Sequence, residues 1–152
     1  MTNLFTRPFL LKQKSPLVTK ETDQWGDILV LDRDGCRVMT FDSRFEQSRM
    51  NLAKPTQLMH KYAQAMFLVN AFTQPKQVTL LGLGGGCLLR CMHELFPDCQ
   101  FHAIELRKKV YHLARQYFHL PNSQRVRVTL QDAKQALAQL DYGETDLILA
   151  DM

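Results

Sequence analysis

The sequence predicts an α/β fold in which a parallel sheet follows a small N-terminal β region. From residue 77 onward, short apolar strands alternate with amphipathic helices, an order that calls for a parallel sheet with crossover connections. Before residue 55 the pattern differs, because apolar runs of strand length flank an Asp-Gly turn, which is typical of a β-hairpin. We therefore divide the chain into residues 1–54, a small β region and linker, and residues 55–152, the α/β domain.

The hairpin strands are expected at residues 25–31 and 36–41, and residues 12–20 are a candidate for another strand. Residues 42–54 are polar and are expected to form a loop. Pro55 suits the first turn of a helix, and apolar residues then follow at spacings of three and four. This spacing predicts an amphipathic helix of about 17 residues.

The α/β domain is expected to contain four strands that alternate with three helices. The strands are residues 77–81, 100–104, 125–130 and 145–150, and the helices are residues 87–96, 107–118 and 133–140. The basic run at the start of the second helix, Arg107 to Lys109, is expected to be a solvated face.

Every predicted strand of this sheet ends in residues that could bind a ligand. Ligands of open parallel sheets bind outside the carboxyl ends of the strands. Three acids and a glycine turn at that edge predict a nucleoside-type pocket. The glycines after the first strand are Gly82, Gly84, Gly85 and Gly86, and the acids after the other three are Glu105, Asp132 and Asp151.

The chemistry of each residue type suits one part of a nucleoside. Glycines let the backbone approach a ligand where a Cβ would clash. Glu105 lies about 20 residues beyond them, where a dinucleotide-binding fold carries its ribose-binding acid. Asp132 could accept from an adenine amino group, and Asp151 would lie beside the first strand, where a reacting group belongs. The alternative is a simple tight turn followed by acids that cap helices.

The glycine spacing favours one nucleoside over another. Gly82-x-Gly84-x-x-Cys87 departs from the dinucleotide pattern at its third glycine, whereas Gly82-x-Gly84-x-Gly86 fits the adenosylmethionine-type turn completely. A ligand of that type carries no phosphate and requires no arginine clamp. Arg90, inside the following helix, is therefore expected at the surface or in a structural ion pair.

Composition excludes several other classes of protein. The chain has 152 residues with 19 basic and 15 acidic side chains and no basic stripe, so no nucleic-acid partner is expected. It has no apolar run of membrane-spanning length and no signal peptide, so no membrane partner and a cytoplasmic location are expected. Cys87 and Cys91 could share a helix face, but no second ligand pair follows, so no metal is expected.

The residues of this pocket carry a family resemblance. Residues 78–90, VTLLGLGGGCLLR, resemble the glycine-rich signature of the spermidine synthase (polyamine aminopropyltransferase) family. Residues 103–106, 131–133 and 147–151 resemble the ends of that family's next three strands. The hairpin followed by Gln47-Ser48-x-Met50 is similar to its short N-terminal β domain, and the resemblance spans roughly residues 25–152.

The resemblance implies a Rossmann-like, methyltransferase-type parallel sheet and a transferase of polyamine biosynthesis. The implied donor is S-adenosylmethionine or its decarboxylated form, the product is methylthioadenosine, and the acceptor is a small-molecule amine, without a metal. Asp151 would be the catalytic carboxylate beside the attacking amine, and Tyr62 a substrate contact. The implied cofactor-binding residues are Gln47, Gly82, Gly84, Gly85, Gly86, Glu105, Asp132 and Ala133.

Two positions depart from the family pattern and keep other functions open. Gly85 stands where the family has an Asp that binds the donor's aminopropyl end, and Tyr62 is several residues further from Gln47 than the family's active-site Tyr. The alternatives are an S-adenosylmethionine-dependent methyltransferase and a non-catalytic nucleoside-binding or assembly module. Under the last alternative this chain is inactive, although its parent protein is a transferase.

Family members continue beyond the strand that ends at Asp151, so we expect this chain to be a fragment, truncated after the fourth strand. A strand at residues 147–150 would then leave an apolar sheet edge exposed. We expect a homo-oligomer contact to cover that edge.

Overall fold

The computed structural model describes residues 16–41, 45–141 and 143–152. It contains two four-stranded sheets, one antiparallel and one parallel. In chain order the elements are β1 (Leu17–Asp23), β2 (Gly26–Arg33), β3 (Cys36–Thr40), β4 (Glu46–Asn51), α1 (Lys61–Phe67), the 3₁₀ helix η1 (Leu68–Ala71), β5 (Gln77–Leu81), α2 (Cys87–Leu95), β6 (Gln100–Glu105), α3 (Lys108–Tyr117), β7 (Val126–Leu130), α4 (Ala133–Leu137) and β8 (Leu147–Ala150).

The N-terminal sheet is an antiparallel meander in the order β1-β2-β3-β4. Its central hairpin closes where Arg33 pairs with Cys36, so only two residues form the turn. Both have positive φ, 53° at Asp34 and 70° at Gly35, as a type I′ turn requires. The hairpin predicted from the Asp-Gly signal is therefore confirmed. The start of the additional strand expected at residues 12–20 lies outside the described residues, and β1 covers its end.

The stretch expected to be a loop contains a strand instead. β4 pairs with β3 from Cys36–Asn51 to Thr40–Glu46, and its buried residues are Ser48 and Met50. The alternation of buried and partly exposed residues that defines a half-buried strand is present, but a serine occupies one of the two inward positions. A polar inward residue hides this pattern in the sequence.

The first helix also begins later than its sequence pattern predicts. α1 starts at Lys61, and the chain from Leu52 to His60 forms turns, anchored by an isolated antiparallel bridge between Met50 and Leu58. After Phe67 the helix tightens into η1. Pro55 therefore lies in the preceding turns.

The second sheet is the predicted parallel one. Its order is β7-β6-β5-β8, with β5 paired on one side to β6 and on the other to β8. The chain adds β6 and β7 outward from β5 and then returns to place β8 on the opposite side. β5 and β8 therefore flank the point where the strand order reverses, which is where open α/β sheets bind ligands.

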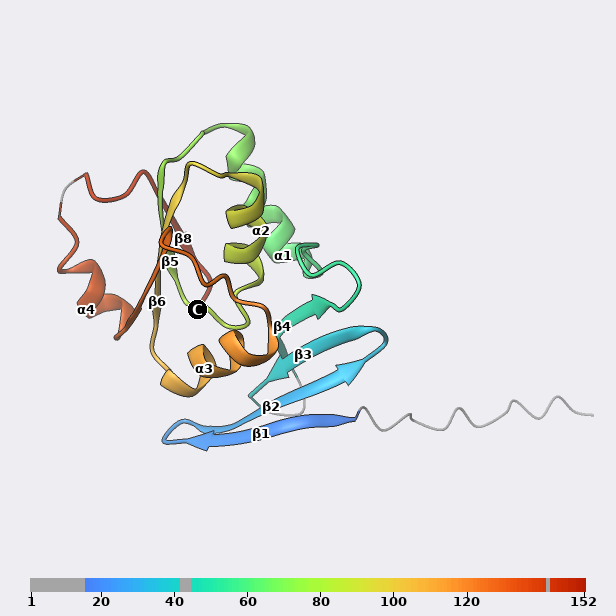
Figure 1. Ribbon diagram of the computed structural model, residues 1–152. Helices are drawn as coiled ribbons and strands as arrows, with labels where there is room; N and C mark the ends of the chain where they lie inside the picture. The colour runs from blue at the N-terminus through green and yellow to red at the C-terminus, as the bar shows by residue number, and fades with distance from the viewer. Residues whose placement is uncertain (1–15, 42–44, 142) are drawn as a thin grey trace, which may run out of the picture.

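Helices cover both faces of the parallel sheet, with α1, α2 and α3 on one side and α4 on the other (Figure 1). The main core joins α2 to the first face through Leu89 and Met92, which pack with Val78, Leu80 and Phe101. A smaller cluster places Ala136 of α4 against Leu81 and Ile104 on the second face. No helix within the described ranges is long and apolar enough to cross a membrane.

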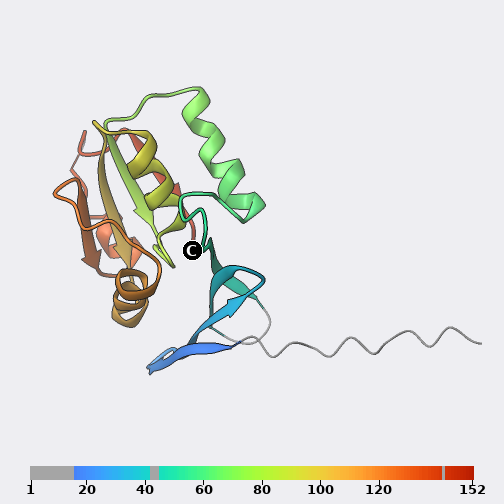
Figure 2. The same cartoon turned by 45° about the vertical axis from the view of Figure 1, so that its right-hand side comes forward.

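The N-terminal sheet lies below the parallel sheet, with α3 between the two (Figure 2). Its inward side chains meet the outer side of α3, so α3 contributes to two cores at once. This second core consists of Ile28, Val30, Met39, Met50, Val110, Leu113 and Phe118. Because each of these side chains is nearly inaccessible to water, the two sheets have a fixed relative position. The proposed domain division at residue 54 stays a prediction.

Arg90 of α2 corrects a sequence-based expectation. Only 5% of it is exposed, and its partners among the described residues are carbonyl oxygens rather than a carboxylate. Its Nε donates to Pro55 (2.7 Å), and its Nη1 donates to Phe118 and Gly85. One guanidinium thus connects the turns before α1, the glycine turn and the end of α3, while its buried Nη2 has no hydrogen-bond partner in the part of the chain that the structure describes.

We expect Arg90→Leu to lower the free energy of unfolding by about 2–3 kcal/mol, because buried carbonyls lose a charged donor. Urea unfolding at neutral pH measures the change. Arg115→Leu is the matched control, since Arg115 is exposed on α3 and its replacement should cost less than about 0.5 kcal/mol. Equal midpoints for the two variants would contradict the structural role of Arg90.

Candidate functional site

A cleft of ≈ 370 Å³ opens at the carboxyl ends of the parallel strands. The glycine turn and the ends of β6, β7 and β8 form its floor, and the N-terminal sheet supplies a wall through Phe41 and β4. Its lining residues are Phe41, Glu46, Gln47, Tyr62, Gly82, Leu83, Gly84, Ile104, Glu105, Leu106, Arg107, Gln131, Asp132, Ala133, Asp151 and Met152.

The glycine turn is packed too tightly to accept side chains. At Gly82 (φ 88°), a Cβ would lie 2.0 Å from the carbonyl oxygen of Asp151. At Gly84 (φ 51°), a Cβ would lie 2.7 Å from Ser48 Oγ. The turn therefore presents bare backbone to the cleft, with β8 on one side and β4 on the other.

The last two glycines of the turn face away from the cleft. Gly85 donates its N–H to Ser48 Oγ at 2.6 Å, and a Cβ on it would meet Phe118 at 2.8 Å and Ser48 Cβ at 2.9 Å. Gly86 has φ 68° and is the N-cap of α2. Neither lines the cleft, so the structure separates them from Gly82 and Gly84, although all four were expected to bind the cofactor.

Glu105 is a buried acid of the cleft that two backbone donors hold in place. It is 7% exposed, and its Oε2 accepts the N–H of Leu83 (3.0 Å) while its Oε1 accepts the N–H of Arg107 (2.8 Å). These two backbone donors hold the carboxylate across the start of the glycine turn and the start of α3. A carboxylate has about four lone-pair sites, so each oxygen can still accept one hydroxyl of a diol.

Asp132 caps a helix and also lines the cleft. It caps α4, because its Oδ1 accepts the N–H groups of Lys134 (2.9 Å) and Gln135 (3.2 Å). Its Oδ2 accepts no hydrogen bond from the described residues, and the residue lines the same cleft as Ala133. Ile104 and Leu106 give this part of the cleft an apolar side.

Asp151 and Tyr62 meet at the end of the cleft next to β8. Asp151 follows β8 directly, and its backbone N–H donates to Leu81 at 2.8 Å. The residue is exposed as a whole, but burial of its carboxyl group raises its pKa, and a hydrogen bond with Tyr62 partly offsets that rise. Burial and the nearby Asp151 carboxyl raise the pKa of the Tyr62 hydroxyl.

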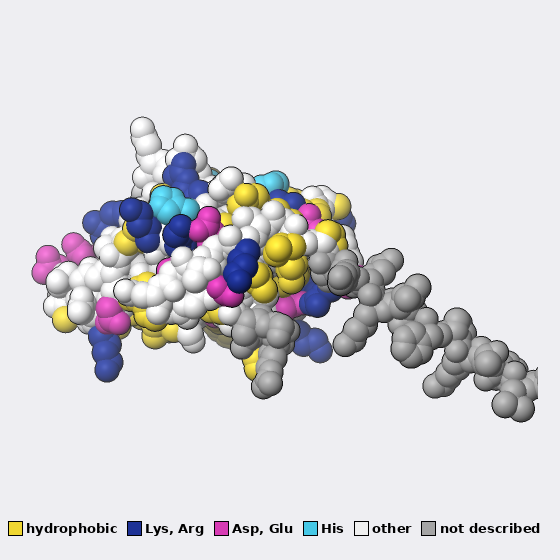
Figure 3. Space-filling model, turned by 90° about the horizontal axis from the view of Figure 1, so that it is seen from below, with side chains coloured by type: hydrophobic (Ala, Val, Ile, Leu, Met, Phe, Trp, Pro, Cys, Tyr) yellow, Lys and Arg dark blue, Asp and Glu magenta, His cyan; other side chains and the backbone are white. Residues whose placement is uncertain are grey.

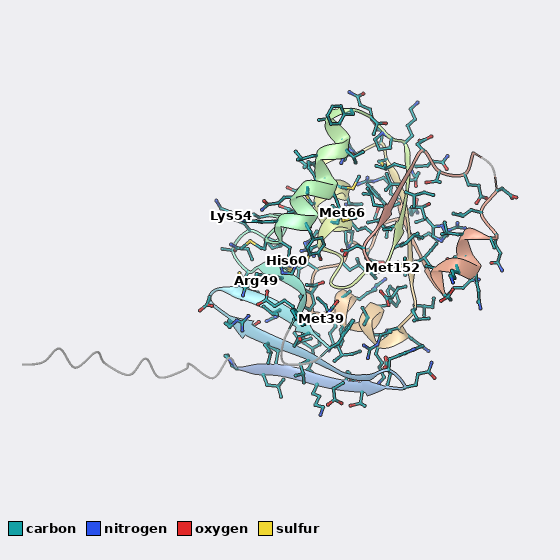
Figure 4. The ribbon with its side chains drawn as sticks, turned by 180° about the vertical axis from the view of Figure 1, so that it is seen from behind. Met39, Arg49, Lys54, His60, Met66 and Met152 are labelled. Carbon is teal, nitrogen blue, oxygen red and sulfur yellow. The ribbon has the colours of Figure 1, made fainter. Side chains whose placement is uncertain are left out.

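Sequence reasoning missed a charged cluster beside this pair. Glu46 of β4 accepts Arg49 Nε and Nη2 at 2.8 and 2.9 Å, pairs with Arg33, and lies 3.3 Å from His60 Nε2. The Arg49 guanidinium, with His60 and Arg33, lowers the pKa of Glu46 to about 2. Arg49 and His60 approach each other from β4 and from the start of α1 (Figure 4). Recognising β4 as a strand would not have been enough, because Glu46 and Arg49 would lie on opposite faces of a regular strand. They meet at an irregularity in the β3–β4 pairing, and His60 comes from another element.

The structure brings most of the predicted site residues to one place. Two buried residues with a part in the site, Ser48 and Arg107, were not among them, and the expectation that Arg107 is solvated is wrong because it is only 7% exposed. No group of three or more potential metal ligands occurs in the part of the chain that the structure describes. The predicted residues that line the cleft are Gln47, Tyr62, Gly82, Gly84, Glu105, Asp132, Ala133 and Asp151.

Several known proteins are similar to this chain in sequence or in structure. No protein-family model matches the chain. A polyamine aminopropyltransferase of Neisseria meningitidis is 29% identical over 128 residues, which cover 82% of this chain and 48% of that protein. A probable spermidine synthase from Corynebacterium glutamicum superposes with a TM-score of 0.74 over 91% of this chain and 53% of its own, at 17% identity.

The fold is spermidine synthase-like and of the methyltransferase type. Human methyltransferase-like protein 13, in complex with SAH, superposes with a TM-score of 0.56 at 27% identity. The match covers 60% of this chain and 47% of that protein. The chain spans about half the length of the curated relatives it matches. The matches therefore establish the fold, and the reaction has to be inferred from the residues of the cleft.

We expect Gly82→Ala to cost more than about 3 kcal/mol, because overpacking against the Asp151 carbonyl adds to the strain of a positive φ. Gly143→Ala is a matched control: φ is 90°, but no atom lies within 4 Å of the added Cβ, so only the backbone cost of about 1–2 kcal/mol applies. Urea unfolding of both variants tests this. Similar losses at the two positions would show that the turn does not press on β8.

We expect Asp151→Asn to raise the melting temperature at pH 7 and to leave it unchanged near pH 3. The folded-state pKa of Asp151 lies above its ordinary value of 3.8, so ionisation favours the unfolded chain. Wild-type stability is therefore lost as the pH rises from 3.8 through the folded-state pKa, and the amide avoids this loss. Thermal unfolding across that range measures it, with exposed Asp98→Asn as the control. A destabilised Asp151→Asn at pH 7 would contradict the argument.

Proposed function

We propose that this chain forms the nucleoside-binding part of a transferase that uses S-adenosylmethionine or its decarboxylated form and delivers an aminopropyl group to a small-molecule amine. One observation carries the proposal. The acids suited to a ribose and an adenine, Glu105 and Asp132, share a single cleft with the Asp151–Tyr62 pair. A donor bound along this cleft would place its sulfur end beside a carboxyl group.

The cleft fits such a donor in size and chemistry. Its volume lies within the range of small-molecule sites, and its walls combine apolar side chains with a few fixed polar groups. Gly82 and Gly84 leave room that a Cβ would fill, which lets a ribose approach the backbone. Glu105 is already oriented by two backbone amides, so it needs no rearrangement to accept two hydroxyl groups.

The residues at the sulfur end suit the transfer step. The donor's sulfonium supplies a carbon whose bond to sulfur breaks with the electron pair moving to sulfur. The amine nitrogen forms the new bond to that carbon and loses a proton, which the Asp151 carboxylate accepts. Burial raises the pKa of Asp151 and makes it a better base than a solvated carboxylate. The Tyr62 hydroxyl lies at the same end of the cleft and partly lowers the pKa of the Asp151 carboxyl group again.

A methyltransferase is the second candidate, and position 85 favours it. Phe118 and Ser48 occupy the space of a Gly85 side chain, so that position supplies no carboxylate to hold a cationic aminopropyl end. A donor that keeps its own carboxylate then meets no repulsion from the glycine turn. The SAH complex of methyltransferase-like protein 13 supports this reading. A non-catalytic module would bind the nucleoside without turnover.

The outer edge of β8 exposes an apolar side chain that another molecule could cover. Ile148 is 44% exposed there, and β8 has β5 as its only strand partner among the described residues. We propose that a homo-oligomer contact covers this edge, as expected for an apolar strand at the end of a sheet.

Isothermal titration calorimetry with S-adenosylmethionine, its decarboxylated form and methylthioadenosine tests the proposal. We expect the decarboxylated donor and methylthioadenosine to bind wild type, and Glu105→Gln to bind both at least tenfold more weakly because one hydroxyl acceptor is lost. Asp98→Asn, distant from the cleft, is the control.

The pattern of affinities separates the candidates. A preference for intact S-adenosylmethionine would favour methyl transfer over aminopropyl transfer. If none of the three ligands binds, the nucleoside assignment is wrong. Unchanged affinity of Glu105→Gln would refute the ribose role of Glu105.

A further inference from the structure

Arg107 connects the cleft to the far turn of the N-terminal sheet. Its Nε and Nη2 donate to the two carboxylate oxygens of Asp23 at 2.9 and 2.7 Å, and Nη2 also donates to the Gly26 carbonyl at 2.9 Å. Asp23 ends β1 and Gly26 begins β2, so the guanidinium closes on the β1–β2 turn from both sides. Bidentate pairs of this kind fix orientation as well as charge.

The same residue touches the cleft in two further ways. Its backbone N–H donates to Glu105 Oε1 at 2.8 Å, and its guanidinium carbon lies 4.3 Å from the centre of the Phe41 ring. Phe41 and Arg107 both line the cleft. A cation over an aromatic face is attracted to it, and the attraction is larger when water is excluded. Arg107 therefore positions both an acid and an aromatic wall of the same cleft.

Burial distinguishes this ion pair from its neighbours. The side chains of Arg107 and Asp23 are 8% and 13% exposed, whereas those of Lys109 and Glu21, a second pair between α3 and β1, are 45% and 38% exposed. Basic and acidic side chains are mixed over the surface seen from the β1 side (Figure 3). Exposed pairs of that kind contribute little, while a buried pair constrains its surroundings.

We propose that Arg107 is a positioning residue for nucleoside binding: held by Asp23, it fixes the Glu105 carboxylate and the Phe41 ring and thereby couples the β1–β2 turn to the cleft. The inference rests on the proposed function, since it assigns the ribose to Glu105. It adds that a residue pair outside the parallel sheet tunes the affinity for the ribose. Asp23 does not touch the ligand and acts only through Arg107.

The chain carries a built-in reporter of this coupling. Trp25, its one tryptophan, lies in the β1–β2 turn, and its backbone N–H donates to the same Asp23 oxygen that accepts Arg107 Nη2, at 2.9 Å. Trp25 is 48% exposed and absent from the cleft lining. A change in Trp25 fluorescence on ligand binding would therefore report a change in the β1–β2 turn and not a contact between Trp25 and the ligand.

The test compares methylthioadenosine with adenine, which lacks the ribose, in Asp23→Asn and Arg107→Lys. We expect both variants to bind methylthioadenosine about tenfold more weakly, equivalent to about 1.4 kcal/mol, and adenine within about twofold of wild type. Trp25 emission should change when methylthioadenosine saturates wild type and should stay unchanged in both variants. Lys109→Ala is the matched control, because it breaks the exposed pair between the same helix and strand and should behave as wild type.

Each result decides the inference. Arg107→Lys keeps the charge and decides the outcome if Asp23→Asn does not fold. Equal losses for adenine and methylthioadenosine would show a merely structural ion pair, and variants that match Lys109→Ala would show no coupling; either result overturns the inference. If wild type binds methylthioadenosine and the variants bind it equally well, only the inference fails. If wild type binds neither ligand, the proposed function fails and the inference with it.

Discussion

The cleft depends on one buried carboxylate that joins three elements. Glu105 ends β6, and its two oxygens accept backbone N–H groups from the glycine turn and from the start of α3. A buried carboxylate is costly unless such donors satisfy it, so the turn and the helix must lie where their amides reach it. Gly82 and Gly84 can then fit against β8 and β4 only because they lack a Cβ. The geometry of the cleft follows from this one group and its two partners.

The N-terminal sheet is part of the site because polar groups need partners across the junction. Ser48 accepts the Gly85 N–H, and Arg90 donates to carbonyls from three separate segments. Removing either would leave buried backbone groups unsatisfied, which costs more than the bonds contribute. The two sheets are thus joined by obligatory polar contacts as well as by the core around Phe118. A cleft built at such a junction responds to changes on either side.

The sequence predicted those features of the fold and the cleft that depend on residues close together in the chain. The parallel sheet and the strand-end acids followed from short-range periodicity and from the rule that parallel strands end at one edge. β4 was missed because Ser48 fills an inward position for the sake of a hydrogen bond 37 residues away in the chain. The buried positions of Arg90 and Arg107 were missed for the same reason, since their partners lie in distant segments. Long-range polar contacts leave no local pattern.

The environments of Asp151 and Glu105 differ in the way that their proposed roles, proton transfer and ribose binding, require. Glu105 accepts hydrogen bonds from two backbone N–H groups, whereas burial raises the pKa of Asp151, and Tyr62 and His60 only partly lower it again. A group that binds hydroxyls must be well oriented. A group that accepts a proton is more effective when its ionised form is less stable. Ionisation of Asp151 therefore destabilises the fold, and the same effect favours proton uptake at the position where the proposed reaction requires a base. A solvated carboxylate at this position would bind an ammonium group but would take its proton less readily.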